Sequence, residues 1–246
     1  MSTLTDRSHR PTYRETVALL AAAQKGRAAG SPAYSVFVNR PAGRLLAAAA
    51  HRAGLGPDQV TAVSAACSGA GILVLALVPP TAWSGVLVAF LLALGYALDS
   101  ADGQVARLRG GGSVAGEWLD HVIDCLKISL LHTAVLLAAV RFFDVPAVWL
   151  LVPLGFAVAD NALFFAQILN DSLKQIKGAP LRRPGAFRPW RSFVLLPVDY
   201  GVLCLSFLLL GWTGAFVVVY TLLFAATAGF TALALPKWFH DMRRLG

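Results

Sequence analysis

The stretch "DSADGQVARLRGGGSVAGEWLDHVID", residues 99–124, joins two long apolar segments of a chain that is otherwise poor in carboxylates. Apolar residues make up 57% of the 246 residues, and charged residues make up only 14%. This composition lies outside the usual range of soluble globular domains and predicts an integral membrane protein. The three cysteines have neither metal-site nor CxxC spacing, so we interpret them as small buried apolar residues.

Outward from this stretch, apolar runs of about 20 residues, the length that crosses a bilayer, recur along the chain. They predict six membrane spans at residues 59–78, 82–106, 113–140, 146–170, 193–211 and 213–235. The glycines at 110–112 predict the turn between the second and third spans. Residues 39–54 carry Arg and His among Ala and Leu at helical spacing, which predicts an amphipathic helix on the membrane surface; a short soluble helix is the alternative.

We therefore expect an all-α, polytopic integral membrane protein: a six-helix bundle with an N-terminal amphipathic surface helix. It should divide into a cytoplasmic N-terminal segment (1–58), a six-span transmembrane domain (59–236) and a cytoplasmic tail (237–246). We expect it in a bacterial cytoplasmic membrane.

The basic residues, which give the chain a formal net charge of +8, predict its orientation. They gather in the N-terminal segment, at 107–109, at 171–191 and in the tail, whereas the alternate loops carry almost no net charge. By the positive-inside rule, both termini and the 107–112 turn should be cytoplasmic. This distribution forms no basic stripe on a polar fold, so we expect no nucleic-acid partner.

Carboxylates are the second feature of the quoted stretch. Asp99 and Asp102 share a face near the cytoplasmic end of the second span, and Asp120 and Asp124 share one near the start of the third. A short turn makes these helices antiparallel neighbours, so the four carboxylates should converge. Each Asp in a membrane helix costs up to about 2.5–3.5 kcal/mol. Such a cluster therefore predicts one or two hard divalent cations, such as Mg²⁺, Mn²⁺ or Ca²⁺, and a phosphate-bearing substrate.

Small residues border these carboxylates. Gly95, Gly103 and Ala106 lie along the Asp99 face, and Gly116 is one turn before Asp120. Such positions allow either close helix packing or the close approach of a flat ligand. Arg107, one turn beyond Gly103, could hold a phosphate.

The spacing of these residues resembles a family signature. The pattern Asp99-x₂-Asp102-Gly103-x₂-Ala106-Arg107-x₈-Gly116-x₃-Asp120-x₃-Asp124 matches that of the CDP-alcohol phosphotransferases at all eight defined positions. The resemblance implies that an alcohol hydroxyl attacks the phosphorus next to the alcohol moiety of a CDP-linked donor and releases CMP. It also implies a dependence on Mg²⁺ or Mn²⁺, a product in phospholipid or lipid-linked biosynthesis, and a homodimer.

The resemblance assigns roles by matching position. It makes Asp124 the catalytic base and a metal ligand. It assigns Asp99, Asp102 and Asp120 to the metal, and Gly103, Ala106, Arg107 and Gly116 to the donor nucleotide and its phosphates. The segment "PDQVTAVS" (57–64) resembles a family segment beside the nucleotide, which makes Gln59 and Thr61 further candidates.

The resemblance leaves two substrate pairs open, and in each pair one substrate is a lipid. Glu117 and His121 beside the motif are similar to the branch that uses a CDP-amino-alcohol and diacylglycerol. The other branch uses CDP-diacylglycerol and a water-soluble polyol. His121 either contacts the acceptor or forms a hydrogen bond with another span.

Four further residues are candidates for the acceptor site. Asp160 lies too deep in the fourth span to be stable unpaired, and Lys127 is a candidate partner at similar depth. Lys174 and Lys177 could bind an acceptor phosphate or an anionic lipid headgroup, or belong to an ordinary positive-inside loop. Asp199, at the start of the fifth span, could reach the same polar cavity.

Two rival functions remain: a membrane cation transporter or channel, and a scaffold that keeps the motif without turnover. The acidic residues gather at one cytoplasmic end, and polar residues do not thread every span, which argues against transport.

Overall fold

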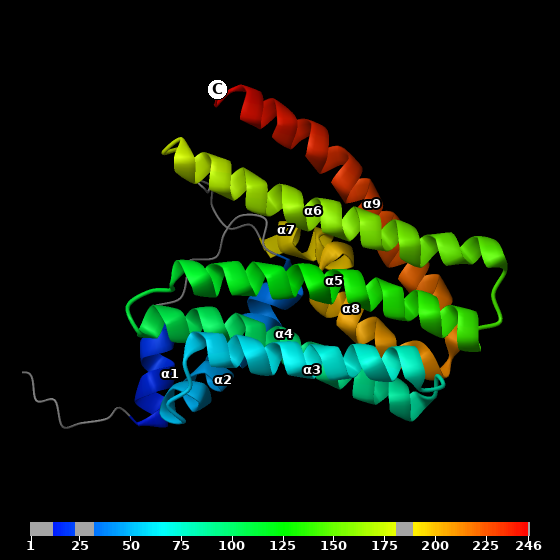
Figure 1. The fold of residues 1–246 in the computed structure, drawn as a ribbon, viewed down its shortest axis with the longest axis horizontal. Helices are drawn as coiled ribbons and strands as arrows, with labels where there is room; N and C mark the ends of the chain where they lie inside the picture. Colours follow the sequence, from blue (N-terminus) through cyan, green and yellow to red (C-terminus); the bar gives the residue numbers. More distant parts are fainter. Residues whose placement is uncertain (1–11, 23–31, 181–188, 246) are drawn as a thin grey trace, which may run out of the picture.

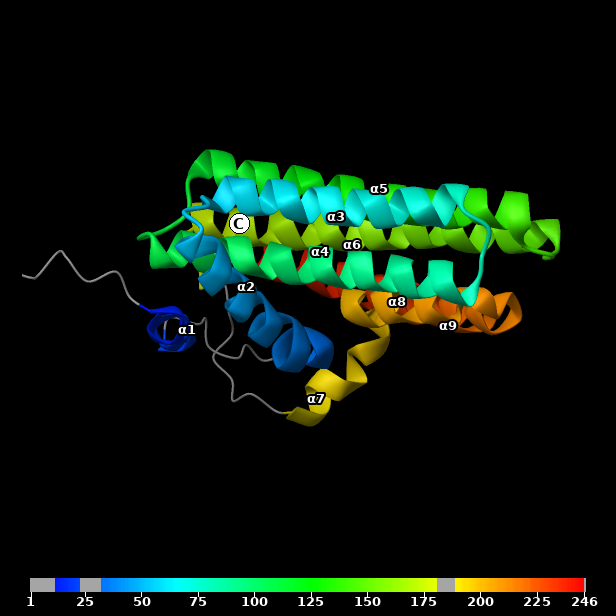
Figure 2. The same cartoon turned by 90° about the horizontal axis from the view of Figure 1, so that it is seen from below.

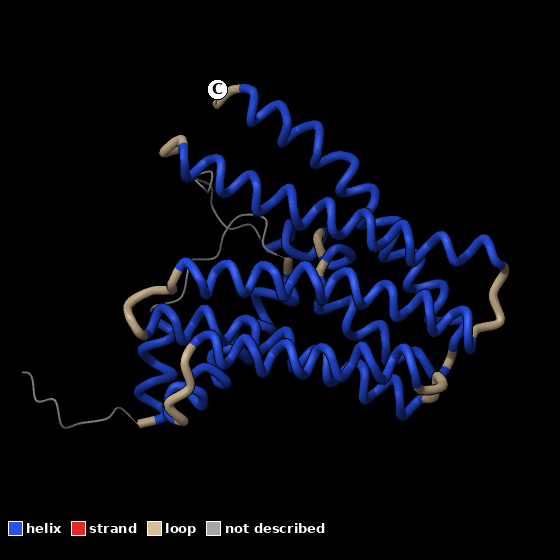
Figure 3. Tube along the Cα trace, viewed as in Figure 1, coloured by secondary structure: helices blue, strands red, loops and turns tan. Residues whose placement is uncertain are grey.

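The computed structural model describes residues 12–22, 32–180 and 189–245, and every regular element in them is helical (Figures 1 and 3). The α-helices are α1 (Tyr13–Ala22), α2 (Arg40–Arg52), α3 (Pro57–Leu77), α4 (Ala82–Leu108), α5 (Val114–Phe142), α6 (Leu151–Ile176), α7 (Pro189–Val194), α8 (Tyr200–Ser206) and α9 (Thr213–Arg243). Short 3₁₀ or π-helical turns adjoin them at Ser35–Asn39, Ala147–Leu150, Leu196–Val198 and Phe207–Gly211. The expected all-α fold is confirmed.

Five of the helices that the structure describes are long and apolar enough to cross a membrane: α3, α4, α5, α6 with its preceding turn, and α9. They correspond to five of the six predicted spans. The predicted span at 193–211 is different, because α7 ends at Val194 and the continuous apolar helix covers only Tyr200–Gly211. Pro197 and Asp199 separate the two pieces.

Local sequence signals explain where the long helices begin. The Thr81 hydroxyl accepts a hydrogen bond from the Ser84 amide at the start of α4, and the Ser113 hydroxyl accepts one from the Gly116 amide at the start of α5. The turn between α4 and α5 contains Gly110 and Gly111 at positive φ, a backbone conformation that residues with a Cβ atom rarely adopt. These signals place the motif residues on the last turns of α4 and the first turns of α5.

The backbone of α3 packs closely against both α4 and α5, and α6 packs against α5 and α9. Helices α4 and α5 run in opposite directions, as predicted (Figure 1). Their backbones, however, do not pack tightly against each other as the predicted contact required. The ion pair between Lys127 of α5 and Asp99 of α4 joins the two helices. A large apolar core that includes Leu92, Phe207, Phe216 and Tyr220 fills the part of the bundle away from the α4–α5 turn.

The N-terminal helices lie against the side of this bundle (Figure 2). Helix α2 buries a face of small residues, and a Cβ atom at Gly43 would lie only 2.9 Å from the carbonyl oxygen of Ala97 in α4. Helix α1, which was not predicted, packs on α2. The Ser35 amide just before α2 donates a hydrogen bond to the Asp199 carboxylate at 3.0 Å. This bond ties the N-terminal segment to the break before α8.

Candidate active site

Three motif carboxylates converge between α4 and α5. Each of Asp99, Asp120 and Asp124 offers an oxygen, and these oxygens lie within 4.8 Å of one another. The side chains are half-buried, and Oδ1 of Asp120 is buried without a hydrogen-bond partner in the described part of the chain. Buried polar atoms are rarely left unpaired, so this oxygen needs a further partner. Three hard oxygen donors at this spacing fit a divalent cation such as Mg²⁺ or Mn²⁺.

Asp102, the fourth motif carboxylate, lies outside this group of three. Its Oδ2 accepts a hydrogen bond from the Thr61 hydroxyl on α3 at 2.7 Å, and its Oδ1 accepts one from the Gly103 amide at 2.5 Å. The Asp102 side chain is buried. Helix α3 therefore contributes directly to the site through Thr61, which the family resemblance made a candidate nucleotide residue.

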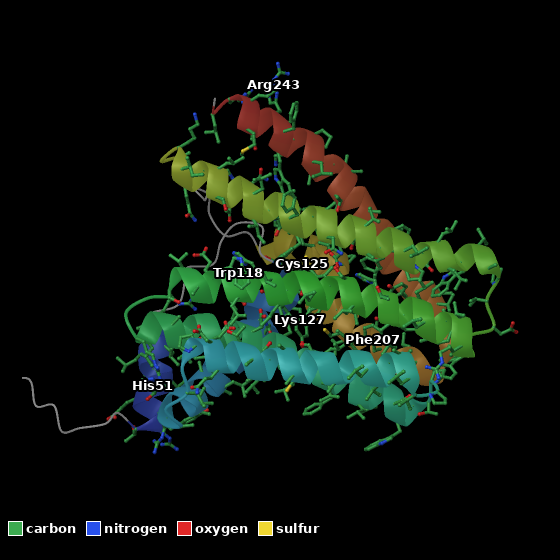
Figure 4. The ribbon with its side chains drawn as sticks, viewed as in Figure 1. His51, Trp118, Cys125, Lys127, Phe207 and Arg243 are labelled. Atoms are coloured by element: carbon green, nitrogen blue, oxygen red, sulfur yellow. The ribbon has the colours of Figure 1, made fainter. Side chains whose placement is uncertain are left out.

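Lys127 forms ion pairs with two motif carboxylates. Its ammonium nitrogen lies 2.5 Å from Oδ1 of Asp99 on α4 and 2.6 Å from Oδ1 of Asp124 on its own helix (Figure 4 labels Lys127). The lysine side chain is only 11% exposed. The expected partnership between Lys127 and Asp160 is therefore wrong, because the nearer carboxylates of Asp99 and Asp124 hold the ammonium group.

Asp160 is paired with a residue that the sequence analysis missed. Its Oδ2 lies 3.2 Å from Nε2 of His132 on α5, and Nδ1 of His132 lies 2.7 Å from the Tyr220 hydroxyl on α9. The imidazole is fully buried and stacks on Phe156 at a centroid distance of 4.2 Å. The available signal was the presence of a histidine five residues beyond Lys127, inside a predicted membrane span.

The expected nucleotide residues gather where the start of α3, the end of α4 and the start of α5 come together. Space remains at Gly103, because a Cβ atom there would meet only the guanidinium of Arg107, at 3.5 Å. At Gly116 a Cβ atom would lie 2.9 Å from the carboxylate of Asp58, which the sequence analysis did not single out. Asp58 directly precedes Gln59 in the segment 57–64, which resembles a family segment beside the nucleotide.

Three other small or polar residues named in the sequence analysis lie in capping or packed positions. The Gln59 side chain accepts a hydrogen bond from the Gly56 amide at 2.8 Å and so caps α3. Ala106 is buried. A Cβ atom at Gly95 would lie 3.1 Å from the Ser64 carbonyl oxygen and would collide with Ser68, so Gly95 serves the packing of α3 on α4.

A cavity of about 440 Å³ opens beside Asp99 and Asp124, between α4, α5, α6, α8 and α9. Asp99, Asp124 and Lys127 line it, and so do Asp160 and Asp199. The expectation that Asp199 reaches the same polar cavity as Asp160 is thus confirmed. Asp99 and Asp124 thus line this cavity, whereas the expected nucleotide residues are not among its described lining residues.

The remaining acceptor candidates lie outside the cavity lining. His121 is 3.9 Å from the Glu117 carboxylate and makes an edge-to-face contact with Phe164. Lys174 is in the last turn of α6 and Lys177 ends it. Lys174 is 14 residues beyond Asp160, or roughly 21 Å along the helix. Residues 181–188, which hold part of the predicted basic loop, lie outside the described residues.

Comparison with known proteins gives a consistent result. A family model described as CDP-alcohol phosphatidyltransferase matches residues 55–231. The phosphatidylinositol phosphate synthase of Mycolicibacterium smegmatis is 30% identical over 172 residues, which cover 69% of this chain and 72% of that protein.

Solved structures of the phosphatidylinositol phosphate synthase of Mycobacterium tuberculosis have the same fold. The crystal structure in complex with manganese and citrate has a TM-score of 0.53 and 26% identity, covering 79% of this chain and 87% of that one. The structure with CDP-DAG bound has a TM-score of 0.56 and 24% identity, covering 82% and 94%. With the family model matched across α3 to α9, the chain belongs to the CDP-alcohol phosphatidyltransferase family.

Proposed function

We propose that this protein is a membrane-embedded, divalent-metal-dependent CDP-alcohol phosphotransferase. It transfers a substituted phosphate group from a CDP-linked donor to an alcohol acceptor, releases CMP, and makes a phospholipid or a related lipid-linked product. The observation that carries the proposal is the convergence of Asp99, Asp120 and Asp124 from two helices, with a buried Asp120 oxygen in need of a partner. Family membership and the name of the relative from Mycolicibacterium smegmatis support it.

Asp99, Asp120 and Asp124 would hold one or two Mg²⁺ or Mn²⁺ ions. Asp102 would be a further ligand of these ions, and the hydrogen bonds from the Thr61 hydroxyl and the Gly103 amide would hold the orientation of its carboxylate. A related crystal structure contains manganese, which supports the choice of metal. Such an ion supplies neutralisation of the donor diphosphate and of the charge that develops on CMP as it leaves.

The donor nucleotide binds on the side of Gly103, Ala106, Arg107 and Gly116. The open space at Gly103 admits a flat base or a ribose, and the guanidinium of Arg107 beside it can donate hydrogen bonds to phosphate oxygens. Thr61 acts here through Asp102, and Gln59 acts by capping α3 at the edge of the same site.

The acceptor hydroxyl approaches Asp124 from the cavity. Asp124 takes the proton of that hydroxyl as the new oxygen–phosphorus bond forms, which a positioned carboxylate can do in the transition state. Lys127 holds Oδ1 of Asp124 and so fixes the direction of the carboxylate. Asp160 lines the acceptor side of the cavity, whereas His121, Lys174 and Lys177 act outside its lining, on headgroups at the membrane surface.

The wider architecture belongs to the same proposal. Residues 1–58 form a cytoplasmic N-terminal segment, residues 59–236 the transmembrane catalytic domain, and residues 237–246 a cytoplasmic tail. The active site faces the cytoplasm, where CDP-linked donors are available, and the protein works as a homodimer.

The test is CMP release by the purified protein in detergent or nanodiscs. A panel of CDP-alcohols, with Mn²⁺ or Mg²⁺ and varied acceptors, should give release with at least one pair, and chelation should abolish it. Asp124→Asn should lose activity, whereas Asp144→Asn, an exposed carboxylate beyond the opposite end of α5, should retain it. Cation flux without CMP release would favour a transporter, and neither activity in folded protein would favour a scaffold.

A further inference from the structure

The cavity beside Asp99 and Asp124 is lined by more acidic than basic side chains, which is unusual for a site that would bind a phosphorylated substrate. Four aspartates line it: Asp99, Asp124, Asp160 and Asp199. Among the described lining residues Lys127 is the only Lys or Arg. Its ammonium group already lies 2.5 and 2.6 Å from two of those carboxylates.

The other two aspartates also use their partners within the protein. Asp199 is buried and accepts hydrogen bonds from the amides of Ser35 and Gly201, each at 3.0 Å. Asp160 faces His132 at 3.2 Å, and the opposite side of that imidazole is engaged by Tyr220 at 2.7 Å. No free Lys or Arg side chain therefore lies beside Asp160 or Asp199 in the described cavity wall.

An anionic acceptor would therefore meet carboxylates and no unpaired cation in the described cavity wall. Taking a phosphate out of water without charge-assisted hydrogen bonds is strongly unfavourable, and nearby carboxylates add repulsion. Cations bound at the motif would offset the charge of Asp99 and Asp124, but in the proposed reaction they serve the donor diphosphate, and Lys127 stays on Oδ1 of Asp124 to orient it. Repulsion from Asp160 and Asp199 would remain.

The rest of the lining suits an uncharged molecule. Phe156, Leu163, Phe164, Leu203 and Phe230 supply apolar wall from α6, α8 and α9. Gln167 on α6 and Thr227 on α9 supply neutral hydrogen-bonding groups. Such a wall can take the hydrocarbon of a lipid alcohol or the carbon face of a polyol, and both present a hydroxyl without an anion.

We infer that the acceptor of this protein is an alcohol that carries no phosphate or other anionic group. The inference rests on the proposed function and narrows its substrate class. It separates this chain from the relatives, whose name describes the synthesis of phosphatidylinositol phosphate.

Matched acceptor pairs that differ by one phosphate test the inference. Purified wild-type protein is assayed for CMP release, with CDP-choline, CDP-ethanolamine or CDP-diacylglycerol as donor. The acceptors are monoacylglycerol and lysophosphatidic acid, glycerol and glycerol 3-phosphate, and inositol and inositol 1-phosphate, and both members of each pair keep a free hydroxyl. We expect the unphosphorylated member of the active pair to have at least tenfold higher kcat/KM, and the identity of that pair distinguishes a lipid from a polyol.

The outcomes separate the inference from the proposed function. CMP release that prefers a phosphorylated acceptor overturns the inference and leaves the phosphotransferase proposal intact. Release with none of the donors and acceptors, in protein that remains folded, overturns the proposed function and the inference with it.

A gain-of-charge variant gives a second test within the same fold. Gln167→Lys places a free ammonium group on the exposed side of the cavity lining. It should shift the kcat/KM ratio about tenfold toward the phosphorylated acceptor, the effect of about one charge-assisted hydrogen bond. Gln175→Lys, on an exposed part of α6 outside the lining, is the matched control and should leave the ratio unchanged. An equal shift in both variants would contradict the inference.

Discussion

Lys127 places one ammonium group between two carboxylates from different helices. Helical spacing alone predicts its contact with Asp124, three residues earlier on the same face. Its contact with Asp99 depends on how α4 is rotated and how far it stands from α5, which no local pattern encodes. For the same reason the sequence suggested Asp160 as the partner of Lys127. The depth of each residue in its span can be counted along the sequence, but the direction in which its side chain points cannot be read there.

Replacing Lys127 separates its positioning role from metal binding. Lys127→Met removes a positive charge beside the carboxylates, so Mn²⁺ should bind at least as tightly as in the wild type. The kcat of CMP release should nevertheless fall about 10–100-fold, because Asp124 loses the group that orients it. Titration of Mn²⁺ by electron paramagnetic resonance, together with steady-state kinetics, measures both effects.

Lys237→Met, at an exposed position of α9, is the control and should change neither quantity. Weaker Mn²⁺ binding in Lys127→Met, or an unchanged kcat, would show that Lys127 does not position Asp124.

Two glycines of the motif region should respond differently to a methyl group. A Cβ atom at Gly103 meets only the flexible end of Arg107, so Gly103→Ala should fold normally. It should lower kcat/KM for the CDP donor about tenfold, equal to 1.4 kcal/mol of lost donor binding. A Cβ atom at Gly95 collides with Ser68.

Gly95→Ala should therefore lower the free energy of unfolding by about 1–3 kcal/mol, as overpacking does. Thermal unfolding in detergent and donor kinetics distinguish the two variants. A stability loss in Gly103→Ala as large as that in Gly95→Ala would place Gly103 in helix packing instead of the nucleotide site.

At the scale of elements, the break between α7 and α8 is the main departure from the predicted spans. Residues 193–211 are apolar enough to suggest one continuous helix, and only Pro197 and Asp199 interrupt them. The stabilising contact comes from far away in the sequence, since Asp199 accepts the amide of Ser35, 164 residues earlier. Composition cannot reveal a helix end that is held by such a distant partner.

Asp199→Ala should therefore loosen two elements together. It removes the acceptor for the Ser35 amide and the cap of α8 at Gly201, and should cost about 1–3 kcal/mol of stability. Hydrogen exchange followed by mass spectrometry should show faster exchange in both 32–39 and 200–206. Asp144→Asn serves as the control, and faster exchange in only one of the two segments would contradict the proposed coupling.

At the scale of the whole molecule, the sequence predicted the helical membrane fold, the residues of the motif and six spans, and five of those spans correspond to long helices. The motif has a fixed spacing along the chain, so it can be recognised in the sequence without knowing how the helices pack. The distance between α4 and α5, the cavity and the buried His132 depend on how α3, α6 and α9 pack around them, which requires three-dimensional coordinates.

The orientation in the membrane remains a prediction from the basic residues. In a cysteine-free variant of the protein, a cysteine introduced at Pro80, between α3 and α4, should react with a membrane-impermeant maleimide added to cells whose outer barrier is permeabilised. A cysteine introduced at Gly111, in the α4–α5 turn, should react only after the inner membrane is opened. The reverse labelling pattern would place the motif end of the bundle outside the cytoplasm.

The most direct measurement is the anomalous X-ray signal of Mn²⁺ in crystals of this protein. We predict a peak at bonding distance from oxygens of Asp99, Asp120 and Asp124, and its loss or marked weakening in crystals of Asp120→Asn. A peak elsewhere in the bundle, or none at saturating Mn²⁺ with a CDP-alcohol present, would contradict the claim that these three carboxylates form the metal centre.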